Sequence, residues 1–193
     1  MLESLIELDK DLLLFLNGLH AEWMDPIMYW ISDKKIWIPF YALLVYFIIK
    51  EYRWHSIFIL IGIGLAITAT DQIISGFMKP FFERFRPSRD PELESLVHIV
   101  NEYRGGRFGF ASSHAGNSFA LAIFMFSIFK DKYRWVKWIF LWAAIVSYSR
   151  IYLGVHYPGD IIVGAGIGLL MGWLFSKGSQ YMQRRYKTGL FAQ

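Results

Sequence analysis

The chain has 193 residues, of which 55% are apolar, and the apolar residues are gathered into blocks. This composition excludes an ordinary soluble domain and predicts an integral membrane protein. The absence of cysteine excludes disulfides, thiolate catalysis and cysteine-ligated metals. The net charge of +4 is modest and the basic residues border apolar blocks, so the charge does not indicate a nucleic-acid partner.

The first part of the chain, residues 1–33, has an amphipathic pattern. Between Leu2 and Leu19, apolar residues recur with acidic residues among them. This pattern predicts a helix that lies on the membrane surface without crossing it. Asp25-Pro26 then begins a short apolar turn. Because the start of the chain is acidic where a signal peptide is basic, we expect no cleavable signal peptide.

Apolar blocks that could cross a membrane follow, and a span needs about 20 largely apolar residues. The first, third and fifth blocks are shorter than this unless their flanks contribute. The pattern predicts an all-α integral membrane bundle of about five to six helices, namely five spans and the N-terminal amphipathic helix. The blocks are Ile36–Ile49, Trp54–Met78, Ala115–Phe129, Trp135–Tyr152 and Ile161–Phe175.

Two features inside the blocks bear on packing. The polar pair Asp71-Gln72 in the second block is expected to be hydrogen-bonded inside the bundle. Small residues would let the helices approach closely. These residues are Gly62, Gly64, Gly164, Gly166, Gly168 and Gly172.

A long loop, residues 79–113, separates the second and third blocks, and long loops in compact proteins are usually functional or disordered. Asp90 is a candidate N-cap and Pro91 a first-turn residue, and apolar residues follow at helical spacing. We therefore predict a short amphipathic helix at 91–103 that rests on the membrane surface and gates entry to a site.

Polar clusters stand at the ends of these blocks, and five spans would place all of them on one side of the membrane. A polar group at the edge of a span is a functional hypothesis by default, because charge is costly in lipid. Such clusters could converge on one pocket. They are Lys79 to Pro87, Ala111 to His114 and Ser149 to Asp160.

The residue types in these clusters suit an anionic group. Lys79, Arg86 and Arg150 supply cations, and arginine presents a fork of donors that fits phosphate. Ser112 and Ser113 open the third block, where the backbone N–H groups of a helix start bind anions. The pattern therefore favours a phosphate site.

The histidines suggest what would happen to a bound phosphate. Asp160 lies four residues after His156 and could accept a hydrogen bond from one imidazole nitrogen, leaving the other as a nucleophile or base. His114 would then be the acid for the leaving oxygen. Each element also has a simpler interpretation. The arginines could be solvated or bind lipid headgroups, the serines could only cap a helix, and His114 could be an interfacial histidine.

Taken together, the clusters resemble the signature of the type 2 phosphatidic acid phosphatase superfamily, the membrane lipid phosphatases related to vanadium haloperoxidases. Lys79–Pro87 and Ser149–Asp160 match its first and third motifs, Lys-x6-Arg-Pro and Ser-Arg-x5-His-x3-Asp. The second motif, Pro-Ser-Gly-His, keeps its Ser and His, but Ala111 and Ser113 replace Pro and Gly. Ser113 retains the backbone amide, so we expect its phosphate contact to survive if the turn does not require a positive φ.

The resemblance implies a role for each matching residue. His156 would attack phosphorus and form a phosphohistidine, Asp160 would orient it, and His114 would protonate the leaving oxygen and then activate water. No metal and no cofactor are implied, and the sequence has no His-Glu-x-x-His motif. The residues that would bind the phosphate are Lys79, Arg86, Ser112, Ser113 and Arg150.

We therefore expect a single membrane-embedded lipid phosphatase domain over residues 1–193. The chain resembles most the small bacterial undecaprenyl-diphosphate phosphatases of the family. Phosphatidylglycerophosphate, phosphatidate and lipid A phosphates are the alternative substrates. A lipid phosphotransferase is a second hypothesis, and a non-enzymatic lipid-binding protein is a third. The expected partners are a lipid phosphate or diphosphate and the membrane lipids, without nucleic acid.

The orientation in the membrane depends on the arginines and lysines. Their numbers near the span ends are equal on the two sides, so the positive-inside rule alone does not choose. If the basic residues beside the polar clusters are catalytic, the basic tail at 177–193 marks the cytoplasm. The site then faces the periplasm or exterior from a bacterial inner membrane.

Overall fold

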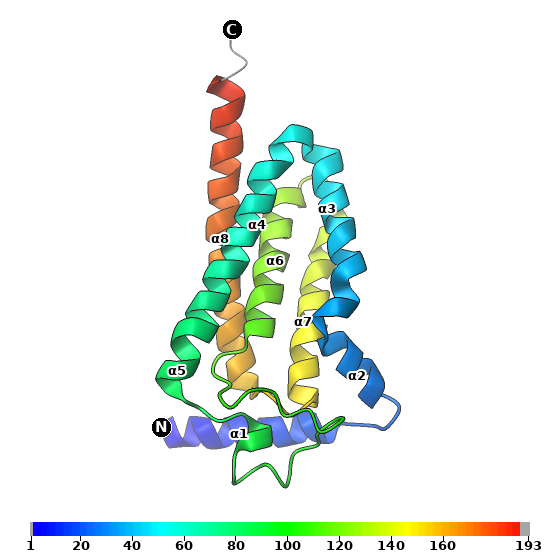
Figure 1. Cartoon of the computed structure of the whole chain (residues 1–193), viewed down its shortest axis with the longest axis vertical. Coiled ribbons are helices and arrows are strands. Elements are labelled where there is room, and N and C mark those ends of the chain that lie inside the picture. Colours follow the sequence, from blue (N-terminus) through cyan, green and yellow to red (C-terminus); the bar gives the residue numbers. More distant parts are fainter. Residues whose placement is uncertain (1, 190–193) are drawn as a thin grey trace.

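The computed structural model describes residues 2–189, which are helical with connecting loops and contain no β-strand. The expected all-helical fold is confirmed. In Figure 1, α1 (Leu2–Gly18) lies across one end of a bundle. The long axis of the bundle is followed by α3 (Ile38–Tyr52), α4 (Ser56–Asp71), α6 (Ser113–Phe129), α7 (Trp138–Tyr152) and α8 (Pro158–Gly189).

Shorter helical elements connect these helices or follow them. Two are α-helices, one is a π-helix, and the rest are single turns of 3-10 helix. They are α2 (Asp25–Ser32), η1 (Lys34–Trp37), η2 (Arg53–His55), the π-helix η3 (Gln72–Met78), α5 (Lys79–Phe82), η4 (Pro87–Arg89) and η5 (Arg134–Lys137).

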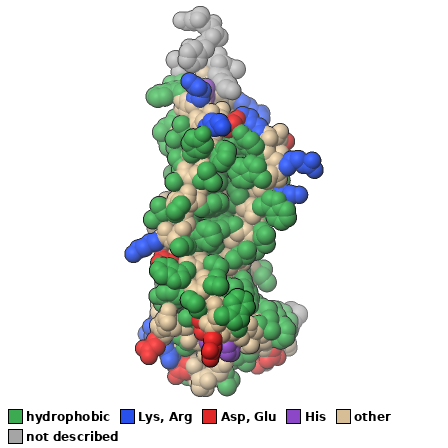
Figure 2. All heavy atoms as spheres, turned by 90° about the vertical axis from the view of Figure 1, so that its right-hand side faces the viewer, with side chains coloured by type: hydrophobic (Ala, Val, Ile, Leu, Met, Phe, Trp, Pro, Cys, Tyr) green, Lys and Arg blue, Asp and Glu red, His purple; other side chains and the backbone are tan. Residues whose placement is uncertain are grey.

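The bundle carries an apolar outer belt. Figure 2 shows hydrophobic side chains over the middle of the molecule, with most charged side chains gathered towards its two ends. Lys34–Phe82 and Pro158–Tyr186 have the length and composition to cross a membrane. The first stretch turns back at Arg53, which has a φ of 45°, so α3 and α4 run antiparallel (Figure 1). These features support a membrane protein. The number of spans stays a prediction.

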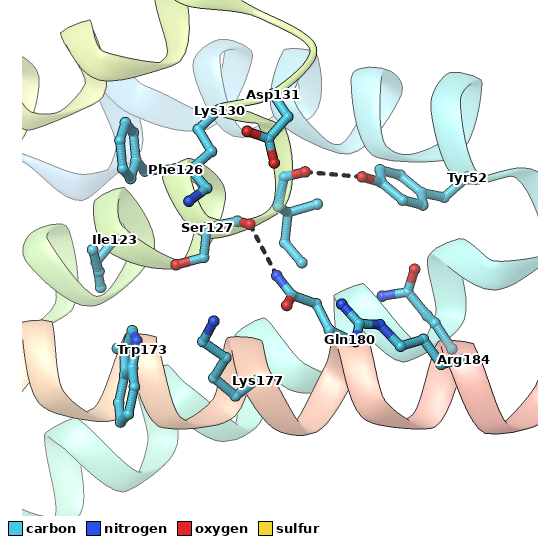
Figure 3. Close-up of a pocket in the computed structure, with 12 residues that line it drawn as sticks. Tyr52, Ile123, Phe126, Ser127, Lys130, Asp131, Trp173, Lys177, Gln180 and Arg184 are labelled. Carbon is cyan, nitrogen blue, oxygen red and sulfur yellow. Dashed lines mark hydrogen bonds between the residues drawn. The ribbon is translucent and has the colours of Figure 1, made fainter.

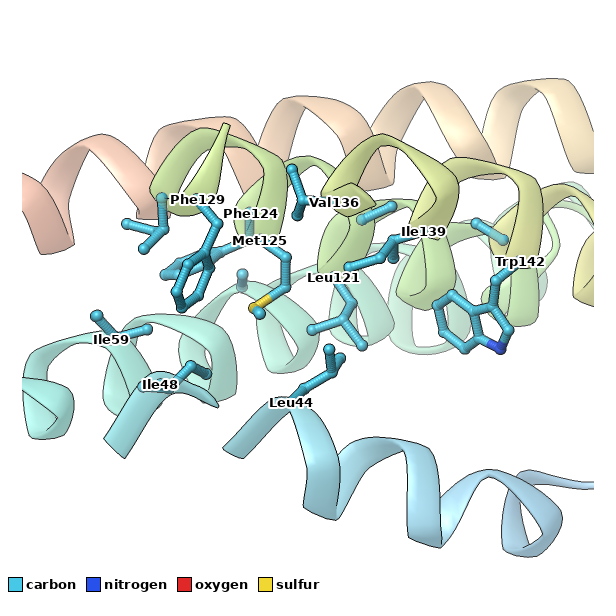
Figure 4. Close-up of a cluster of buried hydrophobic side chains, with 14 of the residues drawn as sticks. Leu44, Ile48, Ile59, Leu121, Phe124, Met125, Phe129, Val136, Ile139 and Trp142 are labelled. Atoms are coloured by element: carbon cyan, nitrogen blue, oxygen red, sulfur yellow. The ribbon is translucent and has the colours of Figure 1, made fainter. Parts of the chain in front are cut away.

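The main apolar core lies in the half of the bundle remote from α1 (Figures 1 and 4). It joins α3, α4, α6 and α7 through buried side chains such as Leu44, Ile59, Phe124 and Ile139. The end of the bundle next to α1 is instead rich in buried polar groups. Buried apolar and buried polar side chains therefore occupy opposite ends of the same helices.

Some local expectations are corrected. The stretch that begins at Asp25-Pro26 forms the helix α2, not a turn, because Pro26 fits the first turn of a helix. Gln72 is exposed, not hydrogen-bonded inside the bundle, whereas Asp71 is half-buried and accepts a hydrogen bond from Ser75 Oγ at 3.3 Å. The expected tail continues α8 as far as Gly189, and residues 190–193 lie outside the described residues.

The prediction of a helix at 91–103 is wrong. Asp90 begins a series of turns, and Leu93 is buried, but no regular helix forms. The N–H of His98 donates to Asn17 Oδ1 at 2.7 Å, and its C=O accepts from Asn17 Nδ2 at 3.1 Å. Because the N–H of His98 already donates to α1, it cannot also donate within a helix at 91–103.

The closest helix packing joins α6 and α8, which run parallel from the same end of the bundle (Figure 1). A Cβ added to Gly168 would lie 2.0 Å from the carbonyl oxygen of Gly116, and Gly164 and Gly172 are similarly close to the α6 backbone. The expected close approach is confirmed at these positions. Gly166 meets nothing within 4 Å and has no such role.

We predict that Gly168→Ala destabilises the protein, because its methyl group would overlap a backbone atom that cannot move independently. Overpacking of this kind costs about 1–3 kcal/mol. Gly166→Ala is the matched control, and it should leave the stability unchanged or slightly raised, since alanine favours helix over glycine. Thermal unfolding in detergent measures the difference. Equal unfolding temperatures for the two variants would contradict this account of the α6–α8 contact.

Candidate active site

A buried imidazole–carboxylate pair lies at the centre of the polar end. His156 is in the loop between α7 and α8, and Asp160 is in the first turn of α8. Their side chains are 1% and 0% exposed, and His156 Nδ1 lies 3.2 Å from Asp160 Oδ2. The same carboxylate oxygen accepts a hydrogen bond from the backbone N–H of Tyr157 at 3.1 Å. These two contacts hold the carboxylate in place beside the imidazole.

The other imidazole nitrogen faces a cation. Arg86 Nη1 lies 3.0 Å from His156 Nε2 and 3.0 Å from the carbonyl oxygen of Val155. A guanidinium can only donate, so Nε2 must be the acceptor and Nδ1 carries the proton. Burial lowers the pKa of His156 well below its usual value, and the nearby Arg86 and Arg150 lower it further. The imidazole is therefore neutral at neutral pH, with a lone pair on Nε2.

Backbone and hydroxyl donors meet at the start of α6. Ser112 is its N-cap, with Oγ accepting from the N–H of Ala115 at 3.4 Å, and the Ser112 N–H donates to the carbonyl oxygen of Asp160 at 3.0 Å. Ser113 is the first residue of the helix and has no positive φ. The turn therefore does not require glycine at position 113.

The side chain of Lys79, on α5, reaches the start of α6. Its Nζ donates to Ser113 Oγ at 2.8 Å and to Ser75 Oγ at 3.2 Å, and the two hydroxyls are 2.8 Å apart. The π-helix η3 lies immediately before Lys79. Its wider turns shift the register of the helix, and π-helical turns are frequent at functional sites.

Arg150 lines an open cavity of about 370 Å³. Its guanidinium donates to Ser32 Oγ from Nη1 and to the hydroxyl of Tyr103 from Nη2, the latter at 3.2 Å. His114 lines the same cavity, together with Lys34 and its neighbour Lys35. One acidic residue, Asp33, also lines it, so the cavity has a net positive charge. It borders His114 but not His156.

Two buried guanidinium atoms have unused donors. The Nε atoms of Arg86 and Arg150 are buried and have no hydrogen-bond partner within residues 2–189. Burial and the nearby Arg150 also lower the pKa of Arg86, to about 10. Buried donors that lack partners are rare in proteins and call for an explanation. An anion would satisfy both the charge and the donors.

A second cavity of about 360 Å³ leads from His114 into the bundle. It lies between α3, α4, α6 and α7, and its lining is mostly apolar, with side chains such as Leu44, Ile63 and Trp142. The two cavities share Ser32, Lys34 and His114 in their linings. An anionic group and an apolar chain could therefore be held on either side of His114.

Two charged residues at the centre of the site were not predicted. Arg84 Nη1 donates to Asp160 Oδ1 at 3.1 Å, and Nη2 donates to Asp9 Oδ2 at 2.8 Å. Its guanidinium also lies over the ring of Tyr157, 3.8 Å from the centroid. Asp9 accepts a second hydrogen bond, from the N–H of Gly159 at 2.7 Å. The helix α1 is therefore linked to the buried carboxylate through a single arginine.

The far end of α1 is tied to the same loop. Asn17 Nδ2 donates to the carbonyl oxygens of Ile151 and Tyr152, at 3.2 and 2.8 Å, at the end of α7. Asp9 bonds the start of α8, so α1 holds both helix ends that flank His156. Arg84 was identifiable as part of the Lys79–Pro87 cluster. No local pattern distinguishes Asp9 from the other acidic residues of α1.

Residues 60–184 match the PAP2 superfamily, and this stretch contains every residue of the predicted site. The chain belongs to the PAP2 superfamily. Two relatives match nearly the whole chain. A lipid A 4'-phosphatase of Bacteroides thetaiotaomicron is 46% identical over 179 residues, which cover 91% of this chain and 78% of the relative. A lipid A 4'-phosphatase of Porphyromonas gingivalis is 38% identical over 187 residues, which cover 96% and 78%.

The fold is shared with the crystal structure of Aquifex aeolicus LpxE. The TM-score is 0.66 at 24% identity, and the match covers 88% of this chain and 95% of that one. The family and the relatives make the chain a membrane lipid phosphatase, a hydrolase of phosphoric ester bonds. Within residues 2–189, no group of three His, Asp or Glu side chains could hold a metal ion. A metal-independent site stays a prediction.

We predict that Asp9→Ala lowers kcat while changing KM little. Loss of Asp9 releases Arg84 and the N–H of Gly159, so the His156–Asp160 pair is no longer held in place. Misplacement of reacting groups by about 1 Å can cost on the order of a hundredfold in rate. Asp9→Asn should recover part of the loss, because its amide oxygen can still accept from Gly159. Phosphate release by purified protein measures both constants.

Asp11→Ala is the matched control, because Asp11 is an exposed carboxylate on the same helix. It should retain the full kcat. An Asp9→Ala enzyme with unchanged kcat, or one that loses no more activity than Asp11→Ala, would remove Asp9 from the positioning of the site.

Proposed function

We propose that this protein is a lipid A phosphatase that removes phosphate through a phosphohistidine on His156. The substrate assignment rests on the two lipid A 4'-phosphatases, because both match nearly the full chain at 46% and 38% identity. Undecaprenyl diphosphate, the first expectation from the sequence, is not confirmed by these relatives. Lipid A was one of the alternatives and is now the better supported one.

The observation that carries the lipid phosphatase chemistry is the pair of cavities that meet at His114. The cationic cavity, with Lys34, Lys35 and Arg150, suits a phosphate group. The apolar cavity enters the bundle and suits an acyl chain. A lipid held in both would have the bond between its phosphate and its apolar part beside His114.

In the proposed first step, His156 Nε2 attacks phosphorus. A P–N bond forms and the P–O bond to the lipid breaks. His114, which takes up a proton when the anionic phosphate enters beside it, gives that proton to the leaving oxygen. Arg86 donates to Nε2 before the reaction, so it must transfer this hydrogen bond to a phosphate oxygen as the substrate enters. Asp160 holds Nδ1–H and stabilises the positive charge that develops on the ring.

In the second step, His114 takes a proton from water, and the water oxygen attacks the phosphohistidine. The P–N bond breaks, inorganic phosphate leaves, and His156 returns to its neutral form. The charge on the phosphoryl oxygens is stabilised by fixed donors, as is general for phosphoryl transfer. We assign this role to Lys79, Arg86, Ser112, Ser113 and Arg150.

We further propose that the whole chain is one membrane-embedded domain with five spans. The contacts of α1 with the loop around His156 support including residues 1–33 in this domain. Exposed apolar side chains on α1, such as Leu8 and Phe15, suit a helix lying on the membrane surface. The end of the bundle next to α1 would face the periplasm from a bacterial inner membrane. The opposite end, which carries the basic tail, would face the cytoplasm.

The test is phosphate release by the purified protein in detergent with a chelator present. Lipid A, undecaprenyl diphosphate, phosphatidylglycerophosphate and phosphatidate would be compared side by side, with His156→Ala as the control. We expect lipid A to be cleaved most efficiently, without any acceptor lipid, and the variant to be inactive because it lacks the nucleophile. Mass spectrometry of the lipid product would locate the phosphate that was removed.

The outcomes separate the parts of the proposal. Preferential cleavage of undecaprenyl diphosphate would contradict the substrate but keep the chemistry. Phosphate that appears only on a second lipid would make the protein a phosphotransferase. Near-normal release by His156→Ala would contradict the mechanism, and dependence on added Mg²⁺ would contradict its metal independence.

A further inference from the structure

A third cavity lies at the end of the bundle opposite the catalytic residues. Its volume is about 540 Å³, and it is formed mainly by the end of α6 and the middle of α8 (Figure 3). Its lining includes the basic residues Lys130, Lys177 and Arg184 and a single acidic residue, Asp131. The cavity therefore has a net positive charge that the catalytic chemistry does not use.

The position of the cavity follows from helix geometry. Lys130 comes seventeen residues after Ser113, and Lys177 seventeen residues after Asp160. At about 1.5 Å of rise per residue, each lysine is about 25 Å along its helix from the catalytic end. The hydrocarbon core of a bilayer is about 30 Å thick. The cavity thus lies near the headgroup level of the opposite leaflet.

The ammonium groups of Lys130 and Lys177 are not paired with the one carboxylate that lines the cavity, Asp131. Figure 3 shows the ammonium groups of Lys130 and Lys177 directed into the space between the two helices. Neither has a hydrogen-bond or ion-pair partner among residues 2–189. Two ammonium groups that enter one cavity repel each other, and an anion between them would remove the repulsion.

Polar groups beside the lysines are held in place. Gln180 projects into the cavity from α8, and its Nε2 donates to the carbonyl oxygen of Ser127 at 2.9 Å, which links α8 to α6 (Figure 3). Both helices thus contribute to a cavity wall that is already fixed. Lys130 and Lys177 are exposed, and they flank a wall that this inter-helix hydrogen bond holds together.

The surroundings favour a lipid over a free anion. Ile123, Phe126 and Trp173 line the side of the cavity nearer the middle of the bundle. Trp173 and Leu170 are 46% and 52% exposed on α8. Tryptophan is enriched at the membrane interface, and basic pockets between helices at the cytoplasmic side bind anionic headgroups. An acyl chain could follow this apolar surface while its headgroup stays between the lysines.

We propose that this cavity binds the phosphate-bearing headgroup of an anionic phospholipid from the leaflet opposite the catalytic site. The headgroup bridges Lys130 at the end of α6 and Lys177 on α8. These two helices carry Ser113 and Asp160 at their other ends, so the lipid stabilises the pair of helices on which the catalytic residues are mounted. This binding does not depend on which lipid the enzyme hydrolyses.

The test compares lipid binding by the full-length wild type and the double variant Lys130→Gln/Lys177→Gln. Native mass spectrometry would measure how tightly one molecule of phosphatidylglycerol, or of zwitterionic phosphatidylcholine, binds to each protein. The unfolding temperature of each protein would also be measured in the presence of each lipid. We expect the wild type to bind phosphatidylglycerol about tenfold more tightly than the double variant does. Phosphatidylglycerol should raise the unfolding temperature of the wild type and leave that of this double variant unchanged.

Two further variants make the result specific. Lys50→Gln/Lys137→Gln removes the same charge from lysines that do not line the cavity, and it should bind like the wild type. Lys130→Arg/Lys177→Arg keeps the charge and should retain binding. Equal loss in both glutamine variants, or no loss in Lys130→Gln/Lys177→Gln, would overturn the proposal. Stabilisation of the wild type by inorganic phosphate alone would also overturn it, in favour of a free-anion site.

Discussion

The buried carboxylate of Asp160 can exist only because its neighbours compensate its charge, and much of the polar end follows from this requirement. A buried charge without partners costs several kcal/mol. Here the carboxylate is hydrogen-bonded by Arg84, by the N–H of Tyr157 and by the imidazole of His156. The backbone carbonyl oxygen of Asp160 also accepts a hydrogen bond from the N–H of Ser112. Asp160 thereby joins the loop after α5, the loop that contains His156 and the start of α6. Because Arg84 also binds Asp9, the surface helix α1 belongs to the same network.

The bundle separates two tasks along the length of its helices. The apolar core of α3, α4, α6 and α7 occupies the end remote from α1, while the charged groups gather where α6 and α8 begin (Figures 1 and 4). The glycine contacts of Gly164 and Gly168 bring the α8 backbone against the start of α6. Close backbone contact of this kind fixes the distance between the Ser112–His114 segment and Asp160 more firmly than side-chain packing could.

The sequence allowed correct predictions where two side chains that meet are separated by only a few residues. The interval from His156 to Asp160 is four residues across a helix start, and this alone predicted their contact. The spacing could not reveal that Asp9 and Asn17 hold the loop from outside, because those contacts join distant parts of the chain. The same long-range contacts explain the failure at 91–103: its apolar spacing is helical, but the backbone of His98 bonds Asn17 instead. The helical propensity of residues 91–103 was overridden by Asn17, which is too far away in the sequence to be seen in a local pattern.

The central claim is that His156 is the nucleophile, and trapping the intermediate tests it most directly. The enzyme would be mixed with substrate, quenched with base within one turnover, digested and analysed by mass spectrometry for phosphorylated histidine. The account predicts a phosphoryl group on His156 in the wild type and none in His156→Ala. A phosphoryl group on another residue, or product formation with no phosphorylated residue at any time, would contradict it.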